Sequence, residues 1–136
     1  MKRRNFLAIS TCALFLPMAA SAGDTANYTP GLIEKALADG KTVFVDYAAE
    51  WCSTCARQER VINALRDSNP AYEQNIMFVR VDWDDFKRHE VTTSRNIPRR
   101  STLLVLRGDQ ELGRIVAGTS EADIKALLDT GLTPAS

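Results

Sequence analysis

The chain has 136 residues, with 17 basic and 17 acidic side chains, and 45% of its residues are hydrophobic. This length suits one domain with a single core, and the hydrophobic share excludes an intrinsically disordered chain. The charge balance lacks the basic excess that nucleic-acid binding requires, so no nucleic-acid partner is expected.

Residues 1–22 have the pattern of a cleavable signal peptide. A basic stretch over residues 2–4 precedes an apolar run over residues 6–16, and a small-residue cleavage motif ends at Ala22. The apolar run is too short for a transmembrane anchor, which needs about 20 apolar residues. The two adjacent arginines fit both the twin-arginine route and the general secretory route, so the sequence leaves the export route open.

Cleavage would leave one domain, residues 23–136, with two of the three cysteines. It would remove three basic residues and no acidic ones, which leaves a net charge of about −3. Cys12 would leave with the signal, so Cys52 and Cys55 remain. Cysteines of exported proteins usually form structural disulfides, but a bridge over two intervening residues closes too short a loop to stabilise much. A structural role therefore explains this pair poorly.

The first half of the domain predicts a helix, a strand and a second helix. Thr29-Pro30 is typical of a helix N-cap and first helical position, and Asp39-Gly40 ends that helix. The apolar, β-branched run over residues 42–47 predicts a buried strand. The second helix is expected from about Cys52 to about Asp67, with a break at Ser68-Asn69-Pro70.

A strand and a polar helix are expected next. Residues 76–81 form a second apolar run and predict a buried strand. The polar stretch 84–96 predicts one helix, opened by Asp84 or Asp85.

A hairpin and a last helix complete the domain. Strands are expected over residues 102–106 and 112–116, joined by a turn at Gly108-Asp109. Ser120 is expected to cap the last helix, and Gly131 lies just past its end. The order predicts an α/β fold: a mixed sheet with a parallel, right-handed strand–helix–strand unit, an antiparallel hairpin, and helices on both faces.

The cysteine spacing assigns chemical roles. Cys52 is expected at the start of a helix, with Cys55 one turn inside it. A helix N-terminus favours negative charge and lowers a thiol pKa, and the thiolate is the species that attacks disulfides. We therefore expect Cys52 to be the exposed nucleophile and Cys55 the more buried, resolving thiol.

The segment 45–55, VDYAAEWCSTC, resembles the active-site segment of the thioredoxin family. It is especially similar to periplasmic members, such as the thioredoxin-like C-terminal domain of membrane thiol-reductant transporters, and the resemblance extends from about Lys41 to Leu128. It implies a thioredoxin-like fold and a periplasmic thiol:disulfide oxidoreductase whose only redox group is the Cys52–Cys55 disulfide. Protein thiols and disulfides would be its substrates, a membrane thiol-reductant transporter its electron donor, and the protein would act as a monomer.

The same resemblance suggests further site residues. Asp46 falls where thioredoxins keep a buried aspartate, which implies a proton acceptor for Cys55; the alternative is an ordinary solvated aspartate at a strand end. Arg80 falls where thioredoxins often carry a lysine, and an arginine acts there through its charge alone. Trp51, just before the pair, is a candidate for substrate binding.

Several positions depart from the family pattern. Ser53-Thr54 replaces Gly-Pro, a dipeptide that helps to set the redox potential, and Ala48 stands in place of a second tryptophan. Little chain lies between Gly23 and Thr29, so the first strand is expected to be very short or missing.

The slot that holds a cis-proline in the family falls on Ser101 here. The alternative alignment makes Pro98 the cis residue and inserts three residues after it; we prefer Ser101 because the strand then needs no insertion. A non-proline cis bond costs about 2.5–4 kcal/mol, so a trans bond before Ser101 is expected. Its hydroxyl would lie near Cys52. Arg99 and Arg100 would give the rim positive charge, which favours the Cys52 thiolate and acidic partner segments, unless both are merely solvated loop residues. Arg100 and Ser101 are therefore further candidates for substrate binding.

Other uses of the two thiols fit the sequence less well. A zinc site needs about four ligands, and the domain offers two thiols and His89, which lies among charged residues. Covalent haem attachment needs a histidine where Ala56 stands. A copper(I) chaperone of the same fold remains as the alternative function. The direction of the exchange is open too, and the resemblance favours a reductase of exported proteins.

Overall fold

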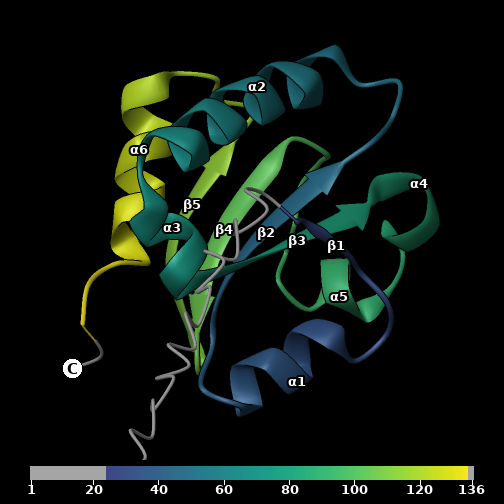
Figure 1. The fold of residues 1–136 in the computed structure, drawn as a ribbon. Helices are drawn as coiled ribbons and strands as arrows, with labels where there is room; N and C mark the ends of the chain where they lie inside the picture. Colours follow the sequence, from purple (N-terminus) through teal and green to yellow (C-terminus); the bar gives the residue numbers. More distant parts are fainter. Residues whose placement is uncertain (1–23, 135–136) are drawn as a thin grey trace, which may run out of the picture.

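The computed structural model describes residues 24–134, which form one five-stranded sheet with helices on both faces (Figure 1). The strands lie in the order β1 (Ala26–Asn27), β3 (Ile76–Asp82), β2 (Thr42–Ala48), β4 (Thr102–Arg107) and β5 (Gln110–Val116). The mixed sheet with helices on both faces confirms the predicted fold class. The expected signal peptide, residues 1–22, lies outside the described residues. None of the helices within residues 24–134 is long and apolar enough to cross a membrane.

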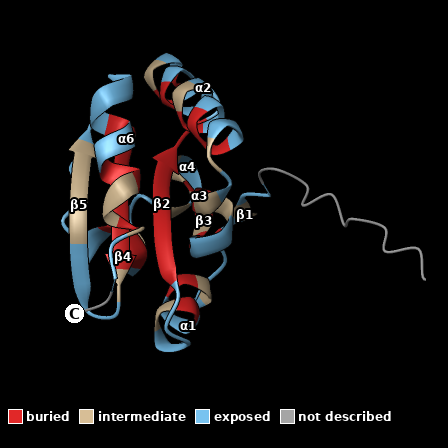
Figure 2. Cartoon of the chain, turned by 60° about the vertical axis from the view of Figure 1, so that its left-hand side comes forward, coloured by how far each residue is buried: buried red, intermediate tan, exposed pale blue. Residues whose placement is uncertain are grey.

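The sheet is built around β2 (Thr42–Ala48), which is buried along its whole length (Figure 2). It pairs in parallel with β3 (Ile76–Asp82) and antiparallel with β4 (Thr102–Arg107). The hairpin partner of β4 is β5 (Gln110–Val116), at one edge. At the other edge β1 (Ala26–Asn27) has two residues, so the first strand is very short, as the sequence suggested.

Two hydrophobic layers cover the sheet because side chains alternate between its faces along each strand. One layer packs α1 (Leu32–Ala38) through Ile33 and Ala36 against Val43, Val45 and Tyr47 of β2. The other packs α2 (Ser53–Ser68), α3 (Pro70–Asn75) and α6 (Glu121–Thr130) against the opposite face. Phe44 and Asp46, which alternate with the first set on β2, therefore lie on the α2 side.

The start of α1 differs from the prediction. The helix is capped by Gly31, with φ 89°, rather than by Thr29, and Pro30 lies before it. The reason is that the chain still pairs with β3 at Tyr28, whose N–H donates to the carbonyl of Arg80. It must then turn before the helix can begin, and glycine adopts the left-handed φ of that turn at little cost.

The helix α2 begins and ends close to the predicted residues, and Ile62 and Leu65 face the core. The break at Asn69 is followed by α3, a helix that was not predicted from the sequence. Asn69 caps it by accepting from the N–H of Ala71, and Pro70 occupies its first turn. Asparagine followed by proline is thus both the end of one helix and the start of the next.

The single helix predicted over residues 84–96 is wrong. Two one-turn helices stand there, α4 (Trp83–Phe86), capped by Asp82, and α5 (Glu90–Thr93), capped by His89. The extended backbone of His89 interrupts the helix, its Nδ1 accepts from the N–H of Val91, and its ring packs edge-on against those of Tyr28 and Phe86. Tertiary packing therefore overrides the local helical preference here.

The predicted N-cap and end of the last helix are confirmed. The hydroxyl of Ser120 accepts from the N–H of Asp123, and Gly131 ends α6. The apolar face of α6 is buried against the sheet through Ile124, Leu127 and Leu128.

Candidate active site

The two cysteines are joined by a disulfide at the start of α2. Strand β2 ends at Ala48, a short loop follows, and Cys52 is the N-cap residue of the helix. Its sulfur accepts from the N–H of Cys55 at 3.1 Å. An N-cap residue normally accepts such a bond through oxygen, and here the reactive sulfur is the acceptor. The predicted position of Cys52 at the start of the helix is confirmed, and a helix N-terminus favours negative charge on such a group.

The expected exposure of Cys52 is wrong. In the disulfide form both cysteine residues are 3% exposed, so burial does not distinguish the two. Ala48 and Ala49 pack with the disulfide, and Trp83 lies against the same cluster. The large hydrophobic residue that is exposed beside the disulfide is instead Trp51, at 60%.

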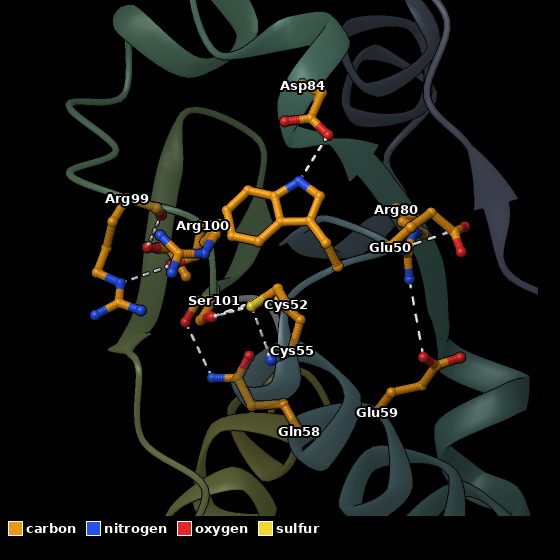
Figure 3. The surroundings of a disulfide bond; sticks show 12 residues. Glu50, Cys52, Cys55, Gln58, Glu59, Arg80, Asp84, Arg99, Arg100 and Ser101 are labelled. Atoms are coloured by element: carbon orange, nitrogen blue, oxygen red, sulfur yellow. Dashed lines mark hydrogen bonds and ion pairs between the residues drawn. A yellow bond between two sulfur atoms is a disulfide. The ribbon is translucent and has the colours of Figure 1, made fainter.

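Ser101 lies directly against the disulfide (Figure 3). Its hydroxyl oxygen is 3.2 Å from Sγ of Cys52 and 3.1 Å from Sγ of Cys55. The described residues contain no cis peptide bond, so the bond before Ser101 is trans and the alternative alignment, with Pro98 as a cis residue, is wrong.

The loop before β4 also contacts Trp51. The guanidinium of Arg100 stacks over the Trp51 ring, 4.5 Å from its centroid, and the indole N–H donates to Asp84 at 2.9 Å. Arg99 donates to the carbonyl of Arg100. Arg100 is therefore not a free, solvated side chain. Substrate binding by Trp51, Arg100 and Ser101 stays a prediction.

Asp46 is buried, with 8% of its surface exposed, so the alternative of a solvated strand-end aspartate does not hold. Among the described residues its Oδ1 has no hydrogen-bond partner. Burial raises the pKa of Asp46 to about 7, against the opposing charge of Arg80, its register neighbour on β3, while Glu59 raises that pKa further. A carboxyl group with this pKa is suited to exchange protons near neutral pH. Its role as proton acceptor for Cys55 stays a prediction.

Arg80 lines both the cavity at Asp46 and the cavity beside the disulfide. Its guanidinium lies 3.8 Å from a carboxylate oxygen of Glu59 and 4.0 Å from one of Glu50. Glu59 and Arg80 line a cavity of about 130 Å³ that contains Asp46. The same two side chains line a second cavity, of about 210 Å³, beside the disulfide. The charges around Arg80 thus lie between the buried carboxyl group and the sulfur atoms.

Three polar residues at this site were not predicted from the sequence: Gln58, Glu59 and Asp84. Gln58 is fully buried, and its Nε2 donates to the carbonyls of Ser101 and Gly118 at 3.0 and 2.9 Å. The sequence does contain a signal for two of them. Gln58 and Glu59 follow Cys55 by three and four residues, and this spacing places them on the same side of the helix as Cys55. For Asp84, expected at a helix start, no local signal indicates the bond to Trp51.

Metal-ligand residues do not gather in the part of the chain that the structure describes: no group of three or more His, Cys, Asp or Glu side chains there is arranged to hold an ion. The single histidine, His89, caps α5.

Comparisons with known proteins agree with this geometry. A family model described as thioredoxin-like matches residues 25–134. A thioredoxin of Echinococcus granulosus is 27% identical over 96 residues, which cover 71% of this chain and 83% of that protein.

Two solved structures resemble the fold. That of the Edwardsiella tarda protein named Trxlp has a TM-score of 0.68 and 30% identity, covering 77% of this chain and 98% of that one. Malassezia sympodialis thioredoxin has a TM-score of 0.70 at 20% identity, covering 82% of this chain and 93% of that one, which is a likeness of fold.

Proposed function

The chain belongs to the thioredoxin-like family. We propose that it is a periplasmic reductase, which transfers electrons from its Cys52–Cys55 dithiol to disulfides in exported proteins. Thiol–disulfide oxidoreductase activity itself follows from the family and the CxxC pair. The proposal adds the direction of the exchange, the compartment and the electron donor.

The observation that carries the chemistry is the disulfide at the N-terminus of α2, next to an exposed tryptophan. In the reductase direction the Cys52 thiolate attacks a substrate disulfide and forms a mixed disulfide, while one substrate sulfur leaves as a thiolate. Cys55 then attacks Sγ of Cys52, the protein disulfide forms, and the second substrate sulfur leaves. The substrate gains two electrons, and the Cys52–Cys55 pair loses them.

The proposed export and the proposed electron donor are supported by the sequence. Residues 1–22 have the pattern of a signal peptide, and segment 45–55 is similar to the thioredoxin-like domain of membrane thiol-reductant transporters. The periplasm is oxidising, so a reductase there needs electrons passed through the membrane. We therefore assign such a transporter as the donor.

Trapping of the thiol state in cells tests the proposal. The full chain is expressed in bacteria with and without a membrane thiol-reductant transporter, the periplasm is acid-quenched, and free thiols are alkylated. We expect a mature protein that starts at Gly23, reduced where the transporter is present and oxidised where it is absent. The Cys52→Ser/Cys55→Ser double variant serves as the control for labelling of other groups.

The reduction potential provides a second check. A reductase should lie near the value of thioredoxin, about −270 mV, whereas a strong oxidant such as DsbA lies near −120 mV. A potential near −120 mV, or a protein that is oxidised in both strains, would contradict the reductase assignment. Retention of the uncleaved chain in the cytoplasm would contradict the location.

A further inference from the structure

We propose that Ser101 is a catalytic residue of the exchange reaction: its hydroxyl donates a hydrogen bond to whichever of the two cysteine sulfurs carries negative charge. This role differs from substrate binding. It rests on the exchange chemistry alone and is independent of the compartment, the donor and the preferred direction.

The geometry gives one hydroxyl access to both reacting atoms. Oγ of Ser101 lies 3.2 Å from Sγ of Cys52 and 3.1 Å from Sγ of Cys55. Rotation about the Cβ–Oγ bond of Ser101 therefore redirects the hydroxyl hydrogen from one sulfur to the other. The side chain is fully buried. A hydrogen bond to a charged acceptor is stronger there than in water, because the surroundings have a low dielectric constant.

The rest of the loop holds that hydroxyl in place. The N–H of Ser101 donates to the carbonyl of Tyr47 at 2.7 Å, and its own carbonyl accepts from Gln58 and from the N–H of Ala117. These bonds fix both backbone polar groups and leave the hydroxyl directed at the sulfurs. The backbone has φ 64°, a left-handed conformation that is uncommon for a residue with a side chain. Gln58, which donates to the Ser101 carbonyl, is a positioning residue.

Each half of the re-reduction step produces a thiolate within reach of Ser101. A donor thiolate attacks Sγ of Cys52, a donor–Cys52 bond forms, the Cys52–Cys55 bond breaks, and Cys55 leaves with the electron pair. The second donor thiolate then attacks the donor sulfur of the mixed disulfide, the donor disulfide forms, and Cys52 leaves as a thiolate. Two electrons and two protons pass from the donor dithiol to the protein. Stabilisation of a leaving thiolate accelerates its departure.

Other charges act on the same sulfurs and must be kept constant in a test. Glu50, Glu59 and Arg80 line the cavity beside the disulfide, and Asp46 lies in the neighbouring cavity. Arg100 lies over the Trp51 ring. A substitution of Ser101 by an uncharged residue changes none of these charges, so its effect reports the hydroxyl.

The test compares Ser101→Ala and Ser101→Gly with the matched control Thr102→Val. Alanine keeps the Cβ atom, and glycine freely adopts φ 64°, so the pair separates loss of the hydroxyl from backbone strain. Thr102 is also buried, and its hydroxyl donates to the carbonyl of Arg99 rather than to a sulfur. Three quantities are measured: the pKa of Cys52 from the pH dependence of alkylation, the equilibrium with dithiothreitol, and the rate of reduction by dithiothreitol.

We expect both Ser101 variants to raise the pKa of Cys52 by about one unit or more, as for a lost hydrogen bond to a charged group. At a pH above the Cys52 pKa of every variant, where the reduced protein carries the thiolate, the reduced protein becomes less stable. The equilibrium with dithiothreitol measured there shifts about tenfold towards the disulfide, which is a potential about 30 mV more negative. Reduction by dithiothreitol slows by a similar factor. Thr102→Val leaves the pKa, the potential and the rate unchanged.

The proposal is overturned if folded Ser101→Ala and Ser101→Gly keep the pKa and potential of the parent chain. It is also overturned if Thr102→Val shifts them equally, since that would assign the effect to the loop as a whole. Thermal unfolding establishes which variants are folded, and if Ser101→Ala is not, Ser101→Gly decides alone.

Discussion

Arg100 stacks on Trp51, with its guanidinium carbon 4.5 Å from the centroid of the indole ring. From another direction the indole N–H is held by Asp84 at 2.9 Å. An aromatic side chain that is 60% exposed is thus fixed by two separate segments of the chain. Because its rotamer is already restricted, a partner that binds against it loses less conformational entropy.

Arg100→Ala should weaken substrate binding more than it changes chemistry. An exposed cation–π contact contributes about 0.5–1 kcal/mol, so we expect KM for a disulfide-bonded protein substrate to rise about twofold to fivefold. The rate of reduction by dithiothreitol, which needs no protein docking, should stay the same. Lys41→Ala removes an equal charge before β2, at the opposite end of that strand from the disulfide, and should leave both parameters unchanged. An unchanged KM in Arg100→Ala would contradict this role.

The positive charge of Arg99 and Arg100 should also make the association with protein partners depend on salt concentration. With an acidic partner segment, the association rate is expected to fall as ionic strength rises, because salt screens the attraction. The Arg99→Ala/Arg100→Ala double variant should show a weaker dependence on salt, measured by stopped-flow between low and physiological ionic strength. If the slope of the double variant equals that of the parent chain, the two arginines do not steer partners.

The two cysteines should behave differently when they are separated. Cys52→Ser should abolish reduction of disulfides, whereas Cys55→Ser should accumulate mixed disulfides with partner proteins, because the resolving thiol is missing. The N–H of residue 55 donates to Sγ of Cys52, so Cys52 in the Cys55→Ser variant should react with an alkylating agent at neutral pH. Resistance to alkylation there would show that the nucleophile is misassigned.

Asp46→Asn should slow turnover and change the pH dependence of stability. The pKa of Asp46 is about 7 in the folded chain and about 4 when unfolded, so the native state binds the extra proton between these values. The free energy of unfolding therefore falls as pH rises from about 4 to about 7, by at most about 4 kcal/mol. Urea unfolding at pH 5 and pH 8 should show this fall in the parent chain and much less of it in Asp46→Asn.

Asp109→Asn, at an exposed turn position, should retain the pH dependence of the parent chain. Turnover that is unchanged in Asp46→Asn, together with lower stability at pH 8, would contradict the proton-transfer role of Asp46.

Arg80 and Glu59 should shift the pKa of Asp46 in opposite directions. Arg80→Gln removes the charge that lowers this pKa, so the pKa should rise, whereas Glu59→Gln removes a charge that raises it, so the pKa should fall. The carboxyl carbon of Asp46, followed by NMR as a function of pH, measures both. Shifts of the same sign in the two variants would indicate a general change of packing instead of the two charges.

Local signals predicted much of this fold because they act within a few residues. The strands that became β2 and β4 were found from their β-branched, apolar runs, and Ser120 from its position before an amphipathic helix. Where a distant contact competes, prediction failed: His89 splits the expected helix because its ring packs on Tyr28 and its side chain caps α5.

The sequence by itself determined the reacting atoms, since the spacing of Cys52 and Cys55 at the start of a helix is a local property. The family resemblance also placed the Ser101 hydroxyl near Cys52, which the structure confirms. Only the tertiary structure decided the rest of their surroundings: burial of Cys52, the contact of Ser101 with Cys55 and the contact of Asp84 with Trp51 depend on segments far apart in the chain. Such contacts depend on how β2, β4 and the helices pack, because a side chain's burial and hydrogen-bond partners are set by every element that meets at that point, and no window of sequence contains them all.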